Sequence, residues 1–242
     1  MPELNAQDAA LFAKLAQVPI DSLWTELDAA GYPDTYMEGL RPLHSDPNRR
    51  MVGRAVTLRY LPMRKDIEER RQASGAVTIN LQAAEEARPG DVMVVDAGGE
   101  SGAGYIGDMI ATRFVVRGGV GLVVDGAIRD LPALRSMDLA LYVRHVHPAA
   151  SWRRIVGMDY NVPVRCGGVA VLPGDILVGD GMGVIVIPPH IAETIADKAL
   201  AREDKETFQR GKLLAGASIY GVYPANEQTT REYEAWKRQK LG

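Results

Sequence analysis

Helical and strand patterns alternate along this chain, and this alternation limits its fold more than any other feature. Apolar residues recur at helical spacing in DAALFAKLAQ and IDSLWTELDAAG, whereas β-branched residues alternate in MVGRAVTLRYL. The same patterns predict helices at 65–87, 105–117, 128–137 and 191–214 and strands at 51–61, 120–125 and 139–146. Such an order is typical of an α/β protein, in which a valine-rich strand such as 120–125 is buried on both faces.

The composition is that of one compact unit. With 242 residues, 46% of them hydrophobic, and no long linker, the chain is expected to form a single domain over residues 1–242. Its net charge of −3 and its lack of lysine- and arginine-rich blocks predict no nucleic-acid and no membrane partner. No apolar run approaches the ~20 residues of a membrane span, and the N-terminus does not resemble a signal peptide. The single cysteine, Cys166, suits a reducing compartment, so we expect a cytoplasmic protein with Cys166 as a small buried hydrophobe.

Opposite charges follow the strand at 120–125. The segment VVDGAIRD places Asp125, Arg129 and Asp130 at its carboxyl end, where α/β proteins usually bind ligands. An arginine fork matches a carboxylate or an enolate oxygen, and an aspartate with nearby waters suits Mg²⁺. The alternative is that Asp130 caps the next helix and Arg129 pairs with a surface acid.

The segment GYIGDMIATRFVVRGG predicts a second part of the same site. Gly107 loosens the backbone before an apolar helix, so the amides of Asp108, Met109 and Ile110 can point outward unpaired, as a site for a carboxylate or phosphate. Twenty residues separate Asp108 from Arg129, enough for one helix and one strand to return the chain to the same sheet edge. Alternatively, Asp108 is only a helix cap. Together these groups could hold an α-keto acid with a divalent cation that polarises its carbonyl and stabilises an enolate.

Three stretches of the sequence resemble one known family. They are GDMIATRFVVRGGVGLVVDGAIRD, NVPVRCGGVAVLPGDILVGDGMGVIVIP and EDKETFQRGKLLAG. From Val52 to Gly216 the chain is similar to the RraA-like family, in particular its 4-hydroxy-4-methyl-2-oxoglutarate aldolase branch. The resemblance implies an α/β fold of the swivelling-domain type, an α/β/β/α sandwich, with a helical N-terminal region at 1–50. It also implies a homotrimer or homohexamer with the site between subunits. The C-terminal extension at 217–242 is expected to be a helix, either solvated or at a subunit contact.

The resemblance further implies a class II aldolase that uses Mg²⁺ or Mn²⁺. Such an enzyme cleaves a 4-hydroxy-2-oxo acid into pyruvate and a second carbonyl compound, often with oxaloacetate decarboxylase activity. In that scheme Arg129 binds the carbonyl or enolate oxygen, Asp130 ligates the metal, and Asp108 orients the water that carries the proton.

The remaining roles are also implied by the resemblance. The turn at Gly107 and the amides of Met109 and Ile110 would bind the substrate carboxylate. The family has a second acid near the metal, which comes from a neighbouring subunit. It corresponds to Glu206 here, and Glu203 is the alternative candidate. The sequence departs from the family pattern at one position near the expected metal. Family aldolases commonly carry an acidic residue there, and this chain has Ala133.

Alternative functions follow from the same sequence. One is a non-catalytic regulator that binds a ribonuclease or another protein, as the family's founding member does, although that member lacks the aspartate that Asp130 supplies here. Another is a related lyase that acts on a different keto or sugar acid. His145 and His147 could bind zinc with a third ligand, line the pocket or simply pack. A Schiff-base mechanism is disfavoured because all seven lysines fall in charged helical stretches.

Overall fold

The computed structural model describes residues 4–75, 77–150 and 154–241. Its main sheet has eight strands in the order β1-β5-β4-β3-β2-β9-β10, and β6 also pairs with β2. These strands are β1 (Arg41–Pro42), β2 (Met51–Pro62), β3 (Asp91–Asp96), β4 (Gly121–Ile128), β5 (Ala140–Val146), β6 (Ile155–Tyr160), β9 (Ile176–Asp180) and β10 (Gly183–Ile187). A separate antiparallel hairpin consists of β7 (Val164–Cys166) and β8 (Val169–Val171).

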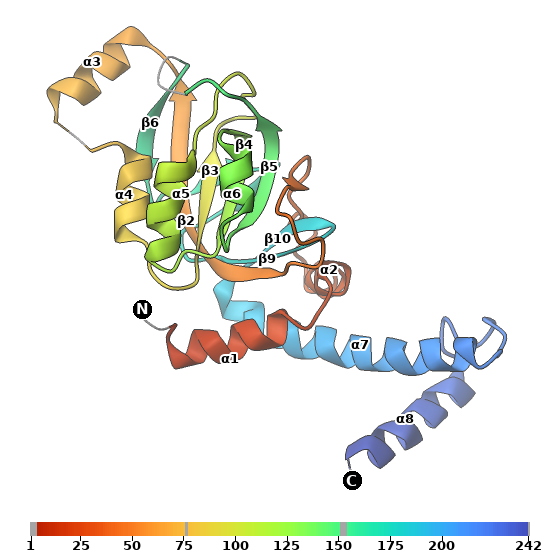
Figure 1. Cartoon of the computed structure of the whole chain (residues 1–242). Helices are drawn as coiled ribbons and strands as arrows, with labels where there is room; N and C mark the ends of the chain where they lie inside the picture. Colours follow the sequence, from red (N-terminus) through yellow and green to blue (C-terminus); the bar gives the residue numbers. More distant parts are fainter. Residues whose placement is uncertain (1–3, 76, 151–153, 242) are drawn as a thin grey trace.

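The helices lie in two groups on opposite sides of the strands (Figure 1). They are α1 (Ala6–Leu15), α2 (Ile20–Ala29), α3 (Lys65–Ala73), α4 (Ile79–Glu86), α5 (Asp108–Val116), α6 (Leu131–Arg135), α7 (Ala192–Leu214) and α8 (Glu227–Leu241). Helices α4, α5 and α6 cover the parallel strands β2 to β5, whereas α1, α2 and α7 pack against β9 and β10. Helix α3 projects from the body beyond the end of β2.

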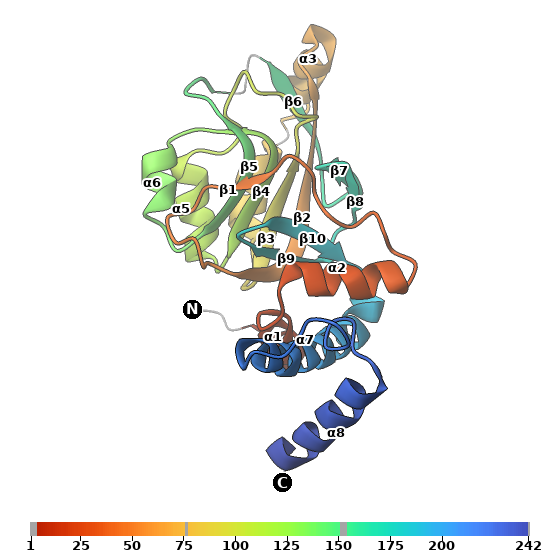
Figure 2. The same ribbon diagram turned by 90° about the vertical axis from the view of Figure 1, so that its right-hand side faces the viewer.

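Side chains alternate between different cores along the central strands. In β4, Leu122 and Val124 pack under the helices α4 to α6, whereas Val123 lies in a core shared with β9, β10 and the hairpin. In β10, Val184 lies in that same middle core and Ile185 faces α1, α2 and α7. Successive residues of a strand point to opposite faces, so β4 and β10 each have one face toward helices and one face toward the middle core. The main sheet therefore provides two β layers, which lie between two layers of helices. Figure 2 shows the hairpin on the side opposite α5 and α6. The expected α/β/β/α sandwich is confirmed.

The structure corrects several predicted boundaries. The helix predicted at 65–87 is two helices, α3 and α4. Strand β4 continues to Ile128, three residues beyond the predicted end, because a register shift between Val124 and Ala127 lets it pass Gly126 and resume pairing with β5. Helix α5 begins only at Asp108, so the segment before it is irregular. Within residues 4–50, only α1 and α2 are helical, and this region also contributes strand β1.

The C-terminal part forms an arm. Every buried residue of α7 except Gln209 lies within its first eight positions, where the helix contacts α1 and α2. Arg202 and Glu203 still contact α2, and beyond them α7 leaves the body and α8 folds back beside it (Figures 1 and 2). The rings of Phe208, Tyr233 and Trp236 lie about this junction, with centroids 5.6 to 6.1 Å apart. Among the described residues, no helix combines the length and apolar character needed to cross a bilayer.

Candidate active site

The end of β4 and the start of α5 are held side by side by backbone hydrogen bonds. All eight residues of β4 are buried. Tyr105 N donates to Ala127 O at 2.9 Å, and Arg129 N donates to Ile106 O at 3.1 Å. The loop that leads into α5 therefore runs along the last residues of β4, and Arg129 emerges directly beside Gly107.

Arg129, Asp130 and the start of α5 form one contact cluster. Arg129 Nε lies 3.1 Å from Asp130 Oδ2, and the Asp108 amide donates to the same oxygen at 3.3 Å. A methyl group on Gly107 would stand 2.6 Å from Asp130 Oδ2 and 2.7 Å from Arg129 Nε. Glycine is therefore the residue that allows the helix start to approach both charges this closely.

Asp130 adopts a backbone conformation that is unusual for its residue type. Its φ of 55° and ψ of 34° place it in the left-handed region, and its side chain does not cap α6. Residues other than glycine adopt this backbone conformation at an energetic cost, and residues in such conformations cluster at ligand-binding sites. The alternative role of Asp130 as a simple side-chain cap is thus not what the structure shows.

The amides at the start of α5 are less free than the sequence suggested. The first internal bond of the helix runs from Ala111 N to Gly107 O, so the preceding three amides have no backbone partner within the helix. However, Met109 N donates to Asp108 Oδ1 at 2.7 Å, and Asp108 N is bound to Asp130. Only the Ile110 amide is without a partner among the described residues. The Asp108 and Asp130 carboxylates accept from the other two amides, because the positive end of a helix attracts nearby acidic side chains.

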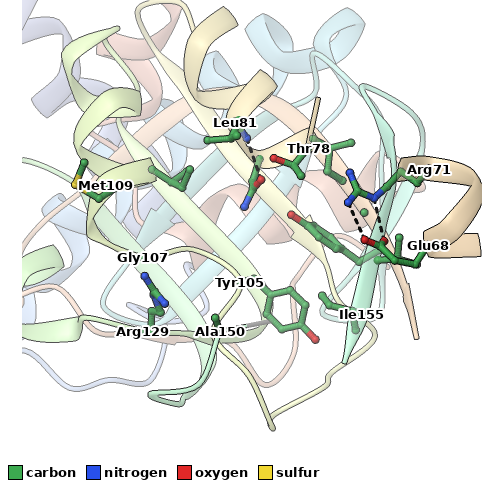
Figure 3. A pocket seen from close by; sticks show the side chains of 17 residues that line it. Glu68, Arg71, Thr78, Leu81, Tyr105, Gly107, Met109, Arg129, Ala150 and Ile155 are labelled. Atoms are coloured by element: carbon green, nitrogen blue, oxygen red, sulfur yellow. Dashed lines mark hydrogen bonds and ion pairs between the residues drawn. The ribbon is translucent and has the colours of Figure 1, made fainter. Parts of the chain in front are cut away.

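A cavity of about 340 Å³ opens beside this cluster, and Arg129 lines it whereas Asp108 and Asp130 do not. It is lined by Tyr60, Glu68, Arg71, Thr78, Ile79, Asn80, Leu81, Gly104, Tyr105, Gly107, Met109, Ile110, Arg129, Ala150, Ile155, Val156 and Gly157. Figure 3 shows Arg129 on one side, Glu68 and Arg71 on the opposite side, and the Tyr105 ring between them. This volume is at the lower end of the range for small-molecule sites, which suits a small organic acid.

Asp130 offers a free oxygen to a cation. Its Oδ1 has no hydrogen-bond partner within the described part of the chain, and 37% of its side chain is exposed. The described residues contain no group of three His, Cys, Asp or Glu side chains placed to hold a metal. A divalent cation at Asp130 would therefore complete its shell with water, substrate or an acid from another subunit, which suits Mg²⁺.

The two glutamates of α7 lie outside this cavity. Glu206 Oε1 is 3.6 Å from Arg202 Nη1, and Glu203 accepts a hydrogen bond from Ser22 Oγ. Neither is among the residues that line the cavity. Within one chain, the structure thus does not bring Glu206 to Arg129 and Asp130, and its role in a neighbouring subunit stays a prediction.

The other candidate residues do not line the cavity. Strand β5 ends at Val146, so His147 lies outside it, and the Nδ1 atom of His147 accepts from Ala149 N at 3.0 Å. His145 is exposed. Burial raises the pKa of the Cys166 thiol well above its usual value, which makes the thiol a poor nucleophile.

Sequence reasoning missed the residues at the opposite side of the cavity. Glu68 and Arg71 come from α3, and Tyr60 comes from β2. The Tyr105 hydroxyl is buried and has no partner among the described residues, and burial keeps its pKa far above neutrality, so it remains a hydrogen-bond donor. The spacing of Glu68 and Arg71, three apart on one helical face, was the available signal for their pairing.

Known proteins resemble this chain in sequence and in fold. The family model RraA-like, described as Aldolase/RraA, matches residues 13–186. A protein of Halalkalibacterium halodurans, provisionally named 4-hydroxy-4-methyl-2-oxoglutarate aldolase, is 37% identical over 71% of this chain and 75% of its own length. A Pseudomonas fluorescens protein with the same provisional name is 34% identical over 65% of this chain and 88% of its own length.

A solved structure agrees with these relatives. Streptomyces coelicolor RraAS2, described as an unusual member of the RNase ES inhibitor RraA protein family, has a TM-score of 0.75 and 33% identity to this chain. The match covers 87% of this chain and 98% of that one. The family match, the relatives and this fold lead to one conclusion, that the chain belongs to the RraA-like family.

Proposed function

We propose that this protein is a divalent-metal-dependent aldolase that cleaves a 4-hydroxy-2-oxo acid into pyruvate and a second carbonyl compound. The observation that carries the proposal is that Arg129, which lines the 340 Å³ cavity, contacts Asp130, and that the Asp108 amide at the start of α5 donates to the same Asp130 oxygen. That cluster combines a guanidinium, a carboxylate with a free oxygen and an unpaired helix amide. These are the groups that an oxo acid and its enolate require.

The reaction would place charge next to Arg129. The C4 hydroxyl loses its proton, the C3–C4 bond breaks, and the electron pair of that bond forms the enolate of pyruvate, which takes a proton at C3. Arg129 hydrogen-bonds the oxygen on which the negative charge develops, and the Ile110 amide binds the carboxylate. Asp108 holds the water that moves the proton. Decarboxylation of oxaloacetate would form the same enolate, so the same residues would support it.

The proposal also includes a divalent cation at Asp130 and an oligomer in which a neighbouring subunit completes the site. Mg²⁺ or Mn²⁺ at Asp130 would supply a Lewis acid for the oxo and carboxylate oxygens. Glu206 of a neighbouring subunit would add a second acid at this position, as part of a homotrimer or homohexamer.

A second candidate is a non-catalytic regulator that binds a ribonuclease or another protein. The likeness to RraAS2, described as a member of an RNase ES inhibitor family, favours it. The two candidates differ in their need for Asp130, since binding of a protein partner requires no metal ligand in a cavity.

A coupled assay of pyruvate release decides between them. The full-length protein is given oxaloacetate and a panel of 4-hydroxy-2-oxo acids with Mg²⁺, Mn²⁺ or EDTA. We expect turnover with either metal and its loss in EDTA and in Asp130→Asn. Asp138→Asn, whose side chain is 91% exposed, is the matched control and should retain activity. Absence of turnover across the whole panel would replace the aldolase by the regulator.

A further inference from the structure

The side of the cavity opposite Arg129 contains an ion pair from a helix that no part of the proposed reaction uses. Arg71 donates from Nε to Glu68 Oε2 at 3.0 Å and from Nη2 to Glu68 Oε1 at 2.9 Å. Both side chains are about three-quarters buried, with 25% and 21% exposed. Figure 3 shows the pair on the cavity side of α3.

The geometry of this pair restricts what it can bind. Glu68 occupies the edge of the Arg71 guanidinium formed by Nε and Nη2, so a second carboxylate would have to bind the other edge, formed by Nη1 and the second N–H of Nη2. There it would lie close to the Glu68 carboxylate, and like charges at such distances repel. The pair as a whole is neutral and presents both a donor and an acceptor, which are the groups that a hydroxyl requires.

The neighbouring polar groups have the same character. Thr78 contributes a hydroxyl, Asn80 an amide side chain and Tyr60 a phenol whose pKa burial raises, so it stays neutral and able to donate. Among the described residues, the charged ones that line the cavity are Arg129, Arg71 and Glu68. The groups around the Glu68–Arg71 pair are therefore neutral and polar, as a hydroxylated tail requires.

We propose that α3 selects the substrate by its tail, and that this tail carries hydroxyl groups and no second carboxylate. The substrate is then a 4-hydroxy-2-oxo acid of the deoxy sugar-acid class, with its oxo group at Arg129, its carboxylate at the Ile110 amide and its hydroxylated end at the Glu68–Arg71 pair. The inference rests on the proposed aldolase function and adds the substrate class to it.

The test compares three substrates that share the pyruvate half. One has a polyhydroxylated tail, one a carboxylate tail and one a methyl tail, and kcat/KM is measured for each by pyruvate release. We expect the hydroxylated tail to exceed the carboxylate tail by about tenfold or more. Glu68→Gln should reduce this preference by about tenfold, because it removes the repelling charge and leaves Arg71 free for a carboxylate. Arg71→Ala should lower kcat/KM for the hydroxylated tail and leave the methyl tail unchanged.

Matched controls come from the same helix. Glu69→Gln and Arg70→Ala change exposed side chains that do not line the cavity and should leave all three values unchanged. No residue of α3 is buried, so these variants should fold like the wild type. If the methyl-tailed substrate is cleaved but the carboxylate tail is preferred, or if Glu68→Gln has no effect on the preference, this inference fails and the aldolase function stands. If no substrate is cleaved, the aldolase function fails and the inference with it.

Discussion

The two ends of the cavity are built in opposite ways. The Arg129 end stands on β4, in which every residue is buried, and on the start of α5, which Phe114 anchors in the core. The Glu68 end stands on α3, in which residues are at most partly buried. A reacting group must be held within a fraction of an ångström, whereas recognition of a tail tolerates some movement. The contrast fits the two proposals, which place the chemistry at the Arg129 end and the choice of substrate at the Glu68 end.

The largest expected effect concerns the support of the rigid end. Phe114 is fully buried under α5, so Phe114→Ala should lower the free energy of unfolding by about 3–5 kcal/mol. Ile67→Ala in α3 is the comparison and should cost less than about 1 kcal/mol, since Ile67 is only half-buried. Denaturant titrations of both variants measure the difference. Equal losses would show that α3 is as firmly integrated as α5.

The next effect concerns turnover. Arg129→Ala should reduce kcat by about 10² or more for every substrate, irrespective of its tail, because the enolate loses its charged partner. Arg113→Ala removes an arginine of α5 that pairs with Glu85 on the surface, and this variant should retain activity. A loss confined to long-tailed substrates would mean that Arg129 recognises the tail and would reverse the assignment of the two ends.

A smaller effect is expected at Gly107. In Gly107→Ala the added methyl group pushes against the flexible ends of Arg129 and Asp130, so the chain should fold while kcat falls by about tenfold. Gly211→Ala in α7 meets nothing within 4 Å and should leave kcat unchanged, with a gain in stability of about 0.5–1 kcal/mol. Steady-state kinetics and thermal unfolding of both variants provide the readout. Full activity in Gly107→Ala would show that the close approach is dispensable.

The smallest effect is the response of the tail preference to pH. The hydrogen bonds from Arg71 hold the pKa of Glu68 below its usual range. Because the pKa of Glu68 is lowered, the Glu68–Arg71 ion pair is intact above the ordinary glutamate pKa of about 4.3. The pair is lost only as the pH falls through the lowered pKa of Glu68. The ratio of kcat/KM for the hydroxylated and carboxylate tails should therefore be constant from about pH 6 to about pH 8. A ratio that changes across neutral pH would point to a different group.

Much of the fold was predictable because it follows from local patterns. The alternation of helix and strand and the burial of β4 gave the α/β class, and the resemblance gave the four-layer sandwich. The approach of Arg129 and Asp130 to Gly107 was predictable for a related reason. One helix and one strand separate these segments, and such a unit returns the chain to the same edge of the sheet.

The predictions failed where turns and side-chain hydrogen bonds interrupt a periodic pattern. The charged stretch from 65 has helical periodicity throughout, yet it divides into α3 and α4. The amides of Asp108 and Met109 were expected to be free, but neighbouring carboxylates occupy them. Periodicity reports which face of an element is apolar and does not report which polar group a folded neighbour presents.

The sequence by itself determined the order of elements and the cluster at the end of β4, since both depend on residues that are close in the chain or joined by one helix and strand. Only the tertiary structure decided that α3 brings Glu68 and Arg71 to the other side of the same cavity. That helix is polar and buries no residue, so no hydrophobic pattern fixes its position. Its place depends on the path of the chain from β2 to α4, which becomes defined only when those elements pack.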